Sequence, residues 1–233
     1  MRRSRQTHQI LLITARRIEG CSTRVSSCCV SNGLIAFYSA VFDSCICCGC
    51  LGVVIMVAKG YSVRKAEPRD LAAVMQVERQ SFEETIVEDE SVFADRIAYT
   101  SGCNYVLVKA DTQSVCGYFT AELWDALQMD VGAFALGHSV RERHQPAGTV
   151  LYISSFALLP EVRGQSIAEK FFASAIERIA VVFPQVEQVV LLVHEDWHKA
   201  IRIYEKQGFI RTQILDRFAW FGDRRAFIYE KTI

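Results

Sequence analysis

The chain has 233 residues, 51% of them hydrophobic, so it is long enough for one full domain with an appendage or for two small domains. Basic and acidic residues balance at 26 each, but residues 1–55 hold six arginines against two acidic residues, and the remainder is mildly acidic. A mildly acidic main domain gives no support to nucleic-acid binding, so no nucleic-acid partner is expected.

The first 55 residues form a leader that differs from the rest. They hold seven of the nine cysteines, and from Leu34 to Ala58 the chain is apolar apart from Asp43. Three interpretations stay open: a disordered leader, a membrane anchor at residues 34–58, or a mis-assigned start of translation, with the true start at Met56. An anchor would bury Asp43 in hydrocarbon, which is costly, and the grouped cysteines lack the paired spacing of a strong metal site. Composition changes at Met56, which places the domain boundary there.

The main domain, residues 56–233, begins with a strand, two helices and a hairpin. It has only two cysteines and no disulfide framework, as is typical of a reduced, cytoplasmic protein. Glu67-Pro68 opens the first helix, since proline suits the first helical turn, and an apolar stripe at helical spacing reaches Phe82. We expect strands at 61–65, 105–110 and 115–124, with a second helix at 90–99.

The second half alternates strands and helices after a long connection, residues 125–148, which contains His138 and His144. Loops of this length inside a compact domain are often functional. Residues 189–193 are continuously apolar, as in a strand buried on both faces, and Gly208 ends a helix. We expect strands at 149–159, 189–193, 209–215 and 226–231, with helices at 166–183 and 198–207. The order β-α-α-β-β-β-α-β-α-β-β predicts a mixed α/β (α+β) domain whose central sheet is flanked by helices.

The segment from Leu158 to Ala168 runs from a strand into a helix and has the chemistry of an anion site. The first amides of a helix lack intrahelical partners, and the helix dipole adds positive potential there. Small residues at Gly164, Ser166 and Ala168 let a phosphate approach the backbone, and Arg163 can add a charged fork. A pyrophosphate is the natural ligand.

Two motifs in this order resemble the GNAT N-acetyltransferase superfamily. Arg163-x-x-Ser166-x-Ala168 is similar to its acetyl-CoA-binding motif, although the family usually has glycine where this chain has Ser166. The second motif is Trp197-x-x-Ala200-x-x-Ile203-Tyr204-x-x-x-Gly208-Phe209, in which only the first residue departs from the family's asparagine.

The resemblance spans about residues 61–233. Near the two ends of this range, Glu78-x-x-Ser81-Phe82 and Ile228-Tyr229-Glu230-Lys231 resemble the ribosomal-protein-alanine acetyltransferases.

The resemblance implies a GNAT-like fold and acetyl-CoA as co-substrate, with no metal. In such enzymes the strand before the motif separates from its neighbour, and its exposed backbone pairs with the pantetheine arm. The residues expected to bind the cofactor are Leu158, Leu159, Arg163, Gly164, Gln165, Ser166, Ile167 and Ala168. Tyr204 matches the family's tyrosine and is assigned as the general acid that protonates the departing thiolate.

The general base is not set by the resemblance. Relatives in the ribosomal branch place a glutamate twelve residues before the tyrosine, and this chain has Leu192 there. Glu195, at the end of the same strand, is the chosen substitute. Further alternatives are His194, Asp196, His198, the loop histidines His138 and His144, and a water held by Ser154 and Ser155.

Phe82, Glu83 and Glu84 are expected to bind the acceptor, because in the family the first helix pair borders it. The acidic residues around them would favour a cationic amine, and Phe218, Trp220 and Phe221 are expected on the opposite side. The predicted function is acetylation of a primary amine on a protein or peptide N-terminus. A small-molecule amine acetyltransferase and an inactive acyl-CoA-binding sensor stay open as alternatives. The chain is expected to be cytoplasmic and a monomer or homodimer, with membrane contact only if residues 34–58 are a real anchor.

Overall fold

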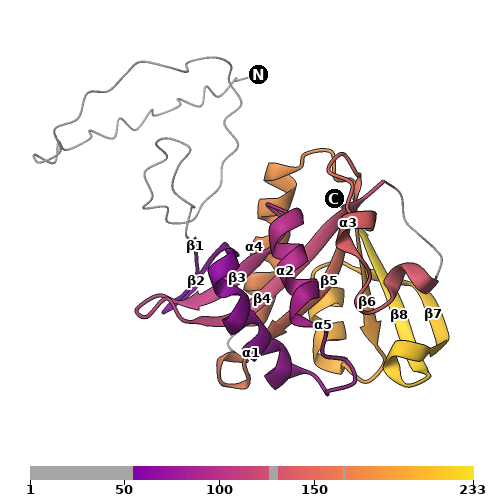
Figure 1. Cartoon of the computed structure of the whole chain (residues 1–233), viewed down its shortest axis with the longest axis horizontal. Coiled ribbons are helices and arrows are strands. Elements are labelled where there is room, and N and C mark those ends of the chain that lie inside the picture. Colours follow the sequence, from indigo (N-terminus) through magenta and orange to yellow (C-terminus); the bar gives the residue numbers. More distant parts are fainter. Residues whose placement is uncertain (1–54, 126–130, 165) are drawn as a thin grey trace, which may run out of the picture. The chain divides into compact units, whose positions relative to one another are not determined.

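The computed structural model describes residues 55–125, 131–164 and 166–233 (Figure 1). The predicted leader, apart from Ile55, lies outside the described residues, so its interpretations and the boundary at Met56 stay predictions. In the described ranges, one eight-stranded sheet has the order β1-β2-β3-β4-β5-β6-β8-β7. Its strands are β1 Ile55–Ala58, β2 Tyr61–Lys65, β3 Tyr105–Lys109, β4 Val115–Trp124, β5 Val150–Leu158, β6 Gln188–His194, β7 Ile210–Phe218 and β8 Arg224–Thr232.

The longer helices lie where the sequence predicted them, and the mixed α/β fold class is confirmed. They are α1 Leu71–Ser81, which follows a 3-10 turn at Pro68–Asp70, α2 Glu90–Tyr99, α4 Ile167–Val182 and α5 His198–Lys206. Gly208, with φ +85°, follows the end of α5 in the left-handed conformation that ends many helices. No helix in the described ranges combines the length and hydropathy that crossing a bilayer requires.

Two features differ from the predicted order. Ile55–Ala58 forms an additional edge strand, β1, which turns back at Gly60 and pairs antiparallel with β2. The connection between β4 and β5, predicted as a loop, contains the short helix α3 Val140–Arg143 and a 3-10 turn at Val131–Phe134. Both are short elements, for which a hydrophobic period is hard to detect.

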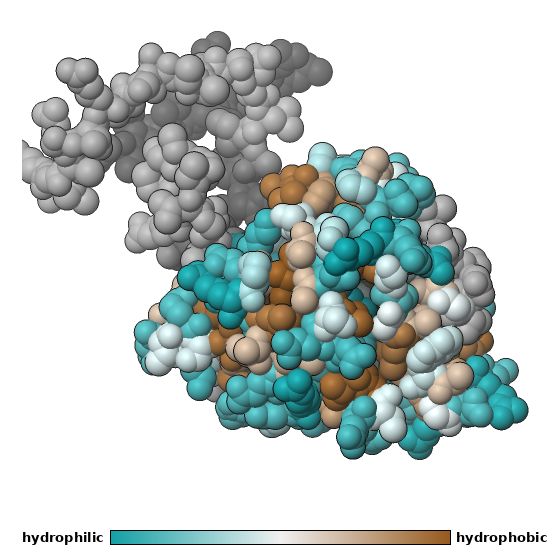
Figure 2. Space-filling model, in the orientation of Figure 1, coloured by the Kyte–Doolittle hydropathy of each residue, from teal (hydrophilic) through white to brown (hydrophobic). Residues whose placement is uncertain are grey.

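The helices cover the two faces of the sheet. Successive residues of β4 point to opposite faces, as strand geometry requires. Tyr118 contacts Glu78 of α1 and Phe93 of α2, whereas the next residue, Phe119, packs on Phe172 of α4. The pair α1 and α2 therefore lies on one face and α4 on the other (Figure 1). A space-filling view from the same side shows hydrophobic residues reaching the surface in patches among hydrophilic ones (Figure 2).

The centre of the sheet opens between β5 and β6. These two strands run parallel, and their pairing ends at Ile153 and Leu191 although both strands continue. At the same point the pairing of β4 with β5 shifts by one residue: Thr120 pairs with Ser155 and Ala121 with Ile153. Ser154 is thus the additional residue of a β-bulge, a feature that bends a strand and re-aims side chains. The bulge lies where β5 leaves β6.

Candidate active site

A cavity of about 570 Å³ lies where β5 and β6 separate. Residues of α1, β5, β6, the turn before α4 and the start of α5 line it. From Ser154 to Leu158, β5 has no pairing with β6. Backbone groups along this edge of β5 are therefore open to a ligand that pairs with them as a strand would, because backbone donors and acceptors need partners.

The turn before α4 forms one end of this cavity. Of the eight residues predicted to bind the cofactor, Leu158, Arg163, Gly164 and Ala168 line it, whereas Leu159 and Ile167 are buried in the main core. Gln165 lies outside the described residues. Ser166 is exposed just before the first residue of α4, and its backbone has φ +57° and ψ +20°, the left-handed conformation. This conformation gives a physical reason for the glycine that is usual in the family at this position.

Arg163 lines the cavity, and its side chain is held by hydrogen bonds. Its Nε donates to the carbonyl of Leu158 at 2.9 Å, and its guanidinium lies 3.3 Å from the hydroxyl of Ser81. Ser81 also donates to the same carbonyl at 3.3 Å. A pantetheine arm that paired with the Leu158 carbonyl would have to displace these two side chains, or pair with another group of β5.

Tyr204, assigned from the family motif as the general acid, lies in the wall of the cavity. Its ring packs on Phe172 and Phe209, and only 7% of the residue is exposed. Burial raises the pKa of its phenol. A tyrosine hydroxyl is protonated at neutral pH in any case, as a general acid must be, and the raised pKa makes this hydroxyl a weaker acid than a free phenol.

Glu195 does not line the cavity. Its carboxylate lies 3.2 Å from the guanidinium of Arg225 and also accepts the backbone amide of Arg225 at 3.2 Å. Asp196 and His198 line the cavity but are exposed, and Asp196 is ion-paired with Arg224 at 2.9 Å.

Several predicted acceptor residues lie together around a second cavity of about 430 Å³. Phe82 and Trp197 line both cavities, with ring centroids 5.2 Å apart, and Glu83 lines the second only. Phe221 packs on Trp197, while Trp220 packs on Phe218. Glu84 is exposed and lines neither cavity. Trp197, which replaces the family asparagine, thus forms an apolar boundary between the two cavities.

His194 contributes to the second cavity but is buried. Its Nδ1 accepts the backbone amide of Asp196 at 3.0 Å, and its ring packs on Trp197 and Phe221. This contact fixes Nδ1 as an acceptor.

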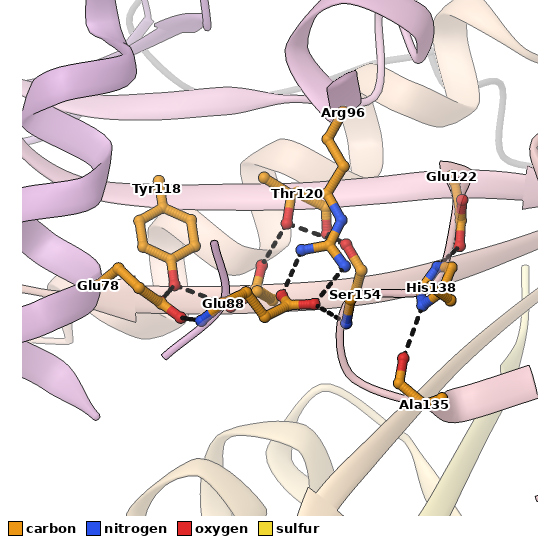
Figure 3. A network of polar contacts seen from close by, with 11 residues as sticks. Glu78, Glu88, Arg96, Tyr118, Thr120, Glu122, Ala135, His138 and Ser154 are labelled. Atoms are coloured by element: carbon orange, nitrogen blue, oxygen red, sulfur yellow. Dashed lines mark hydrogen bonds and ion pairs between the residues drawn. The ribbon is translucent and has the colours of Figure 1, made fainter. Parts of the chain in front are cut away.

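The loop histidines are held against the sheet. His138 contacts Glu122 of β4 through Nε2 and the carbonyl of Ala135 through Nδ1 (Figure 3). Neither His138 nor His144 lines either cavity. Burial lowers the pKa of His144, whose Nδ1 accepts the amide of Leu123 at 3.1 Å. They anchor the connection between β4 and β5.

A buried polar network on the α1 side of the sheet was not predicted. Glu88 forms a two-pronged ion pair with Arg96 of α2 and accepts the amide of Gly137 at 2.7 Å (Figure 3). Glu78 of α1, named in the sequence only as part of a motif, is 2% exposed, lines the large cavity and accepts the hydroxyl of Tyr118. No spacing in the sequence indicates these contacts, because they join residues brought together only by packing.

In the described ranges no three His, Cys, Asp or Glu side chains gather as a metal site. The two cysteines of the main domain, Cys103 and Cys116, are buried free thiols.

Comparison with known proteins assigns the family. A model described as the acetyltransferase (GNAT) family matches residues 71–209. The chain therefore belongs to this family, and it is an acyltransferase. No curated protein matches the chain by sequence.

Solved structures share the fold at low identity. The loading GNATL domain of CurA from Lyngbya majuscula is 14% identical with a TM-score of 0.62, over 74% of this chain and 97% of that chain. The ribosomal-protein-S18-alanine N-acetyltransferase from Escherichia coli is 16% identical with a TM-score of 0.55, over 74% and 94%. Arabidopsis thaliana Naa50, solved with the bisubstrate analogue CoA-Ac-MVNAL, is 16% identical with a TM-score of 0.56, over 75% and 99%.

Proposed function

We propose that this chain transfers an acetyl group from acetyl-CoA to the primary amine of a protein or peptide N-terminus. The observation that carries the proposal is the separation of β5 and β6 beyond Ile153 and Leu191, which opens a cavity with the turn before α4 at one end and Tyr204 in its wall. One cavity thus combines the turn predicted to hold the cofactor with the tyrosine predicted to protonate the thiolate.

The turn before α4 suits the pyrophosphate of acetyl-CoA. Gly164, with φ +113°, lines the cavity just ahead of the helix. Apart from Gly164 and its two chain neighbours, no heavy atom of the described residues lies within 4 Å of the place where a Cβ would stand. A phosphate can therefore approach the backbone at the positive end of α4. The pantetheine arm would then follow the unpaired edge of β5 toward Ser154.

The reaction is a direct attack. The neutral amine forms a C–N bond at the thioester carbonyl, and the attacking nitrogen, now positively charged, loses one proton to the base and from there to solvent. The tetrahedral oxyanion collapses, and the C–S bond breaks. Backbone N–H groups at the bulge near Ser154 are suited to stabilise the oxyanion, and Tyr204 gives its proton to the departing thiolate. Solvent then restores the proton on Tyr204. Glu195 remains the base predicted from the sequence, although its carboxylate is engaged with Arg225.

The cavity walls support an acceptor larger than a small amine. Beyond Phe82 and Trp197 the second cavity adds about 430 Å³, enough room for more than one residue of a chain. Its lining mixes Glu83 and Asp196 with Arg224. The predicted acidic attraction for a cationic amine rests on Glu83, because Asp196 is already paired with Arg224. The cytoplasmic location also stays a proposal, supported by the buried free thiols Cys103 and Cys116.

An acceptor screen with the full chain tests the proposal. Acetyl-CoA is incubated with peptides that have free N-termini, the same peptides with blocked N-termini, and small amines, and products are found by mass spectrometry. We expect acetylation of free peptide N-termini. Acetylation of small amines alone would favour the first alternative, and acetyl-CoA binding without any product would favour the sensor. A chain that neither binds nor uses acetyl-CoA would refute the proposal.

A further inference from the structure

The base for the proposed transfer is absent from the position where the resemblance would place it. That position is Leu192, and the substitute Glu195 lies outside the cavity lining with its carboxylate against Arg225. An amine is protonated in part at neutral pH, so a proton acceptor that communicates with the cavity speeds the attack. The carboxylates that line the cavity are therefore the candidates for this proton acceptor.

Three carboxylates line the large cavity: Glu78, Glu88 and Asp196. Glu88 is held by two nitrogens of Arg96 and by the amide of Gly137, so its charge is already neutralised. Asp196 is exposed and paired with Arg224. Glu78 has no basic side chain bonded to it in the described part of the chain.

Glu78 is connected to the opened strand through two hydroxyl groups. One carboxylate oxygen accepts the hydroxyl of Tyr118 from β4, and the other accepts the backbone amide of Glu88 at 3.3 Å (Figure 3). The Tyr118 oxygen lies 2.8 Å from the hydroxyl of Ser155. Ser155 lines the cavity immediately after the bulge. The path Ser155–Tyr118–Glu78 thus runs from the cavity to a buried carboxylate.

The directions of these hydrogen bonds follow from counting protons. A tyrosine hydroxyl has one proton, and Tyr118 donates it to Glu78. Ser155 must then be the donor in its contact with Tyr118, which leaves the lone pairs of Ser155 free to accept a proton from the cavity. The path is therefore set to move a proton inward.

We propose that Glu78 is the final proton acceptor for the acceptor amine, reached through Ser155 and Tyr118. An N–H bond of the ammonium breaks as Ser155 takes its proton, Ser155 passes its own proton to Tyr118, and Tyr118 passes its proton to Glu78. The amine is left neutral with its electron pair free to attack, and Glu78 is left as a carboxylic acid. After product release the acid loses the proton to solvent by the reverse path.

The surroundings of Glu78 suit this role. Burial is the main reason that the pKa of Glu78 is raised, to about 7. The negative charge of Glu88 also raises this pKa, whereas the hydrogen bond from Tyr118 and the positive charge of Arg96 lower it. These groups face it from β4, α2 and the segment between α1 and α2. A base that titrates near the working pH combines a useful deprotonated fraction with useful strength.

The test compares Glu78→Gln with the wild-type full chain, using the most active acceptor of the screen described above. We expect kcat to fall by about 10²–10⁴-fold, the usual contribution of a general base. We also expect the wild-type kcat to rise with pH through about 7, and this rise to disappear in Glu78→Gln. The dissociation constant of acetyl-CoA, measured by calorimetry, should change less than about twofold, which also shows that the variant is folded.

Further variants keep the proposal testable if Glu78→Gln folds poorly. Tyr118→Phe breaks the path but leaves the carboxylate, and it should lower kcat and alter the pH profile in the same way. Glu195→Gln removes the rival base, and Glu187→Gln, at an exposed site with no contact to either cavity, controls for loss of a carboxylate.

Unchanged kcat and pH profile in Glu78→Gln and Tyr118→Phe would overturn the assignment, as would a large loss in Glu195→Gln alone. Because this inference rests on the proposed function, a wild-type chain that acetylates no amine would overturn both.

Discussion

Ser166 stands where the family usually has glycine, and its backbone conformation predicts how a change to glycine affects stability. It precedes α4 in the left-handed conformation, with φ +57° and ψ +20°. Its side chain makes no capping hydrogen bond to the helix. Replacing Ser166 with glycine therefore removes backbone strain without removing a cap.

We expect Ser166→Gly to raise the free energy of unfolding by a small amount. A residue with a Cβ costs about 1–2 kcal/mol in the left-handed region, whereas glycine adds about 0.4–1 kcal/mol of unfolded-state entropy. The difference predicts that Ser166→Gly stabilises the fold by about 0.5–1 kcal/mol, or about 1–4 °C in Tm for a domain of this size. Ser166→Ala should be neutral within about 0.5 kcal/mol, because no cap is lost. Ser166→Val should destabilise by more than about 1 kcal/mol, since β-branched residues fit this region worst.

Urea unfolding of the four full-length proteins, followed by far-UV circular dichroism, measures this order. A Ser166→Gly variant less stable than the wild type would refute the strain argument. A Ser166→Ala variant that loses more than about 1 kcal/mol would show that the serine hydroxyl makes a stabilising contact. Titration with CoA should show that Ser166→Gly binds at least as tightly as the wild type, since the backbone amides stay in place.

Three further predictions concern other parts of the site. Tyr204→Phe should lower kcat with little change in acetyl-CoA affinity, because it removes the donor to the thiolate and keeps the ring; unchanged turnover in a thiol-release assay would defeat the assignment. Arg96→Leu should cost about 3–5 kcal/mol in denaturant unfolding, since it leaves Glu88 charged and buried without its partner, and a loss below about 1 kcal/mol would contradict this. Burial raises the pKa of Cys103 to about 12 and of Cys116 to about 11, so iodoacetamide at about pH 8 should modify them only after unfolding, as peptide mapping would show.

Much of the fold could be predicted because its signals are local. Alternating and helical hydrophobic periods predicted the strands β2 to β8 and the four longer helices but not the edge strand β1, and Gly208 predicted the end of α5. The strand-to-helix turn at Arg163 and the tyrosine at position 204 were predicted from short motifs, and the structure places both at one cavity.

The polar network could not be predicted, because it depends on packing between distant segments. Glu78 and Tyr118 are 40 residues apart, and their contact requires both the register of β4 and the seating of α1 on it. Glu88 is one of the acidic residues that follow Phe82 in the sequence, yet it is 7% exposed and paired with Arg96. Charged residues are rarely buried unless paired, and only the fold reveals the pair.

The structure of the full chain crystallised with acetyl-CoA tests the central claim most directly. The account predicts pyrophosphate density at the backbone of residues 163–168, a pantetheine arm along Ser154–Leu158, and the thioester near Tyr204. Acetyl-CoA bound elsewhere, or a cavity between β5 and β6 that stays free of it at saturating concentration, would contradict the account.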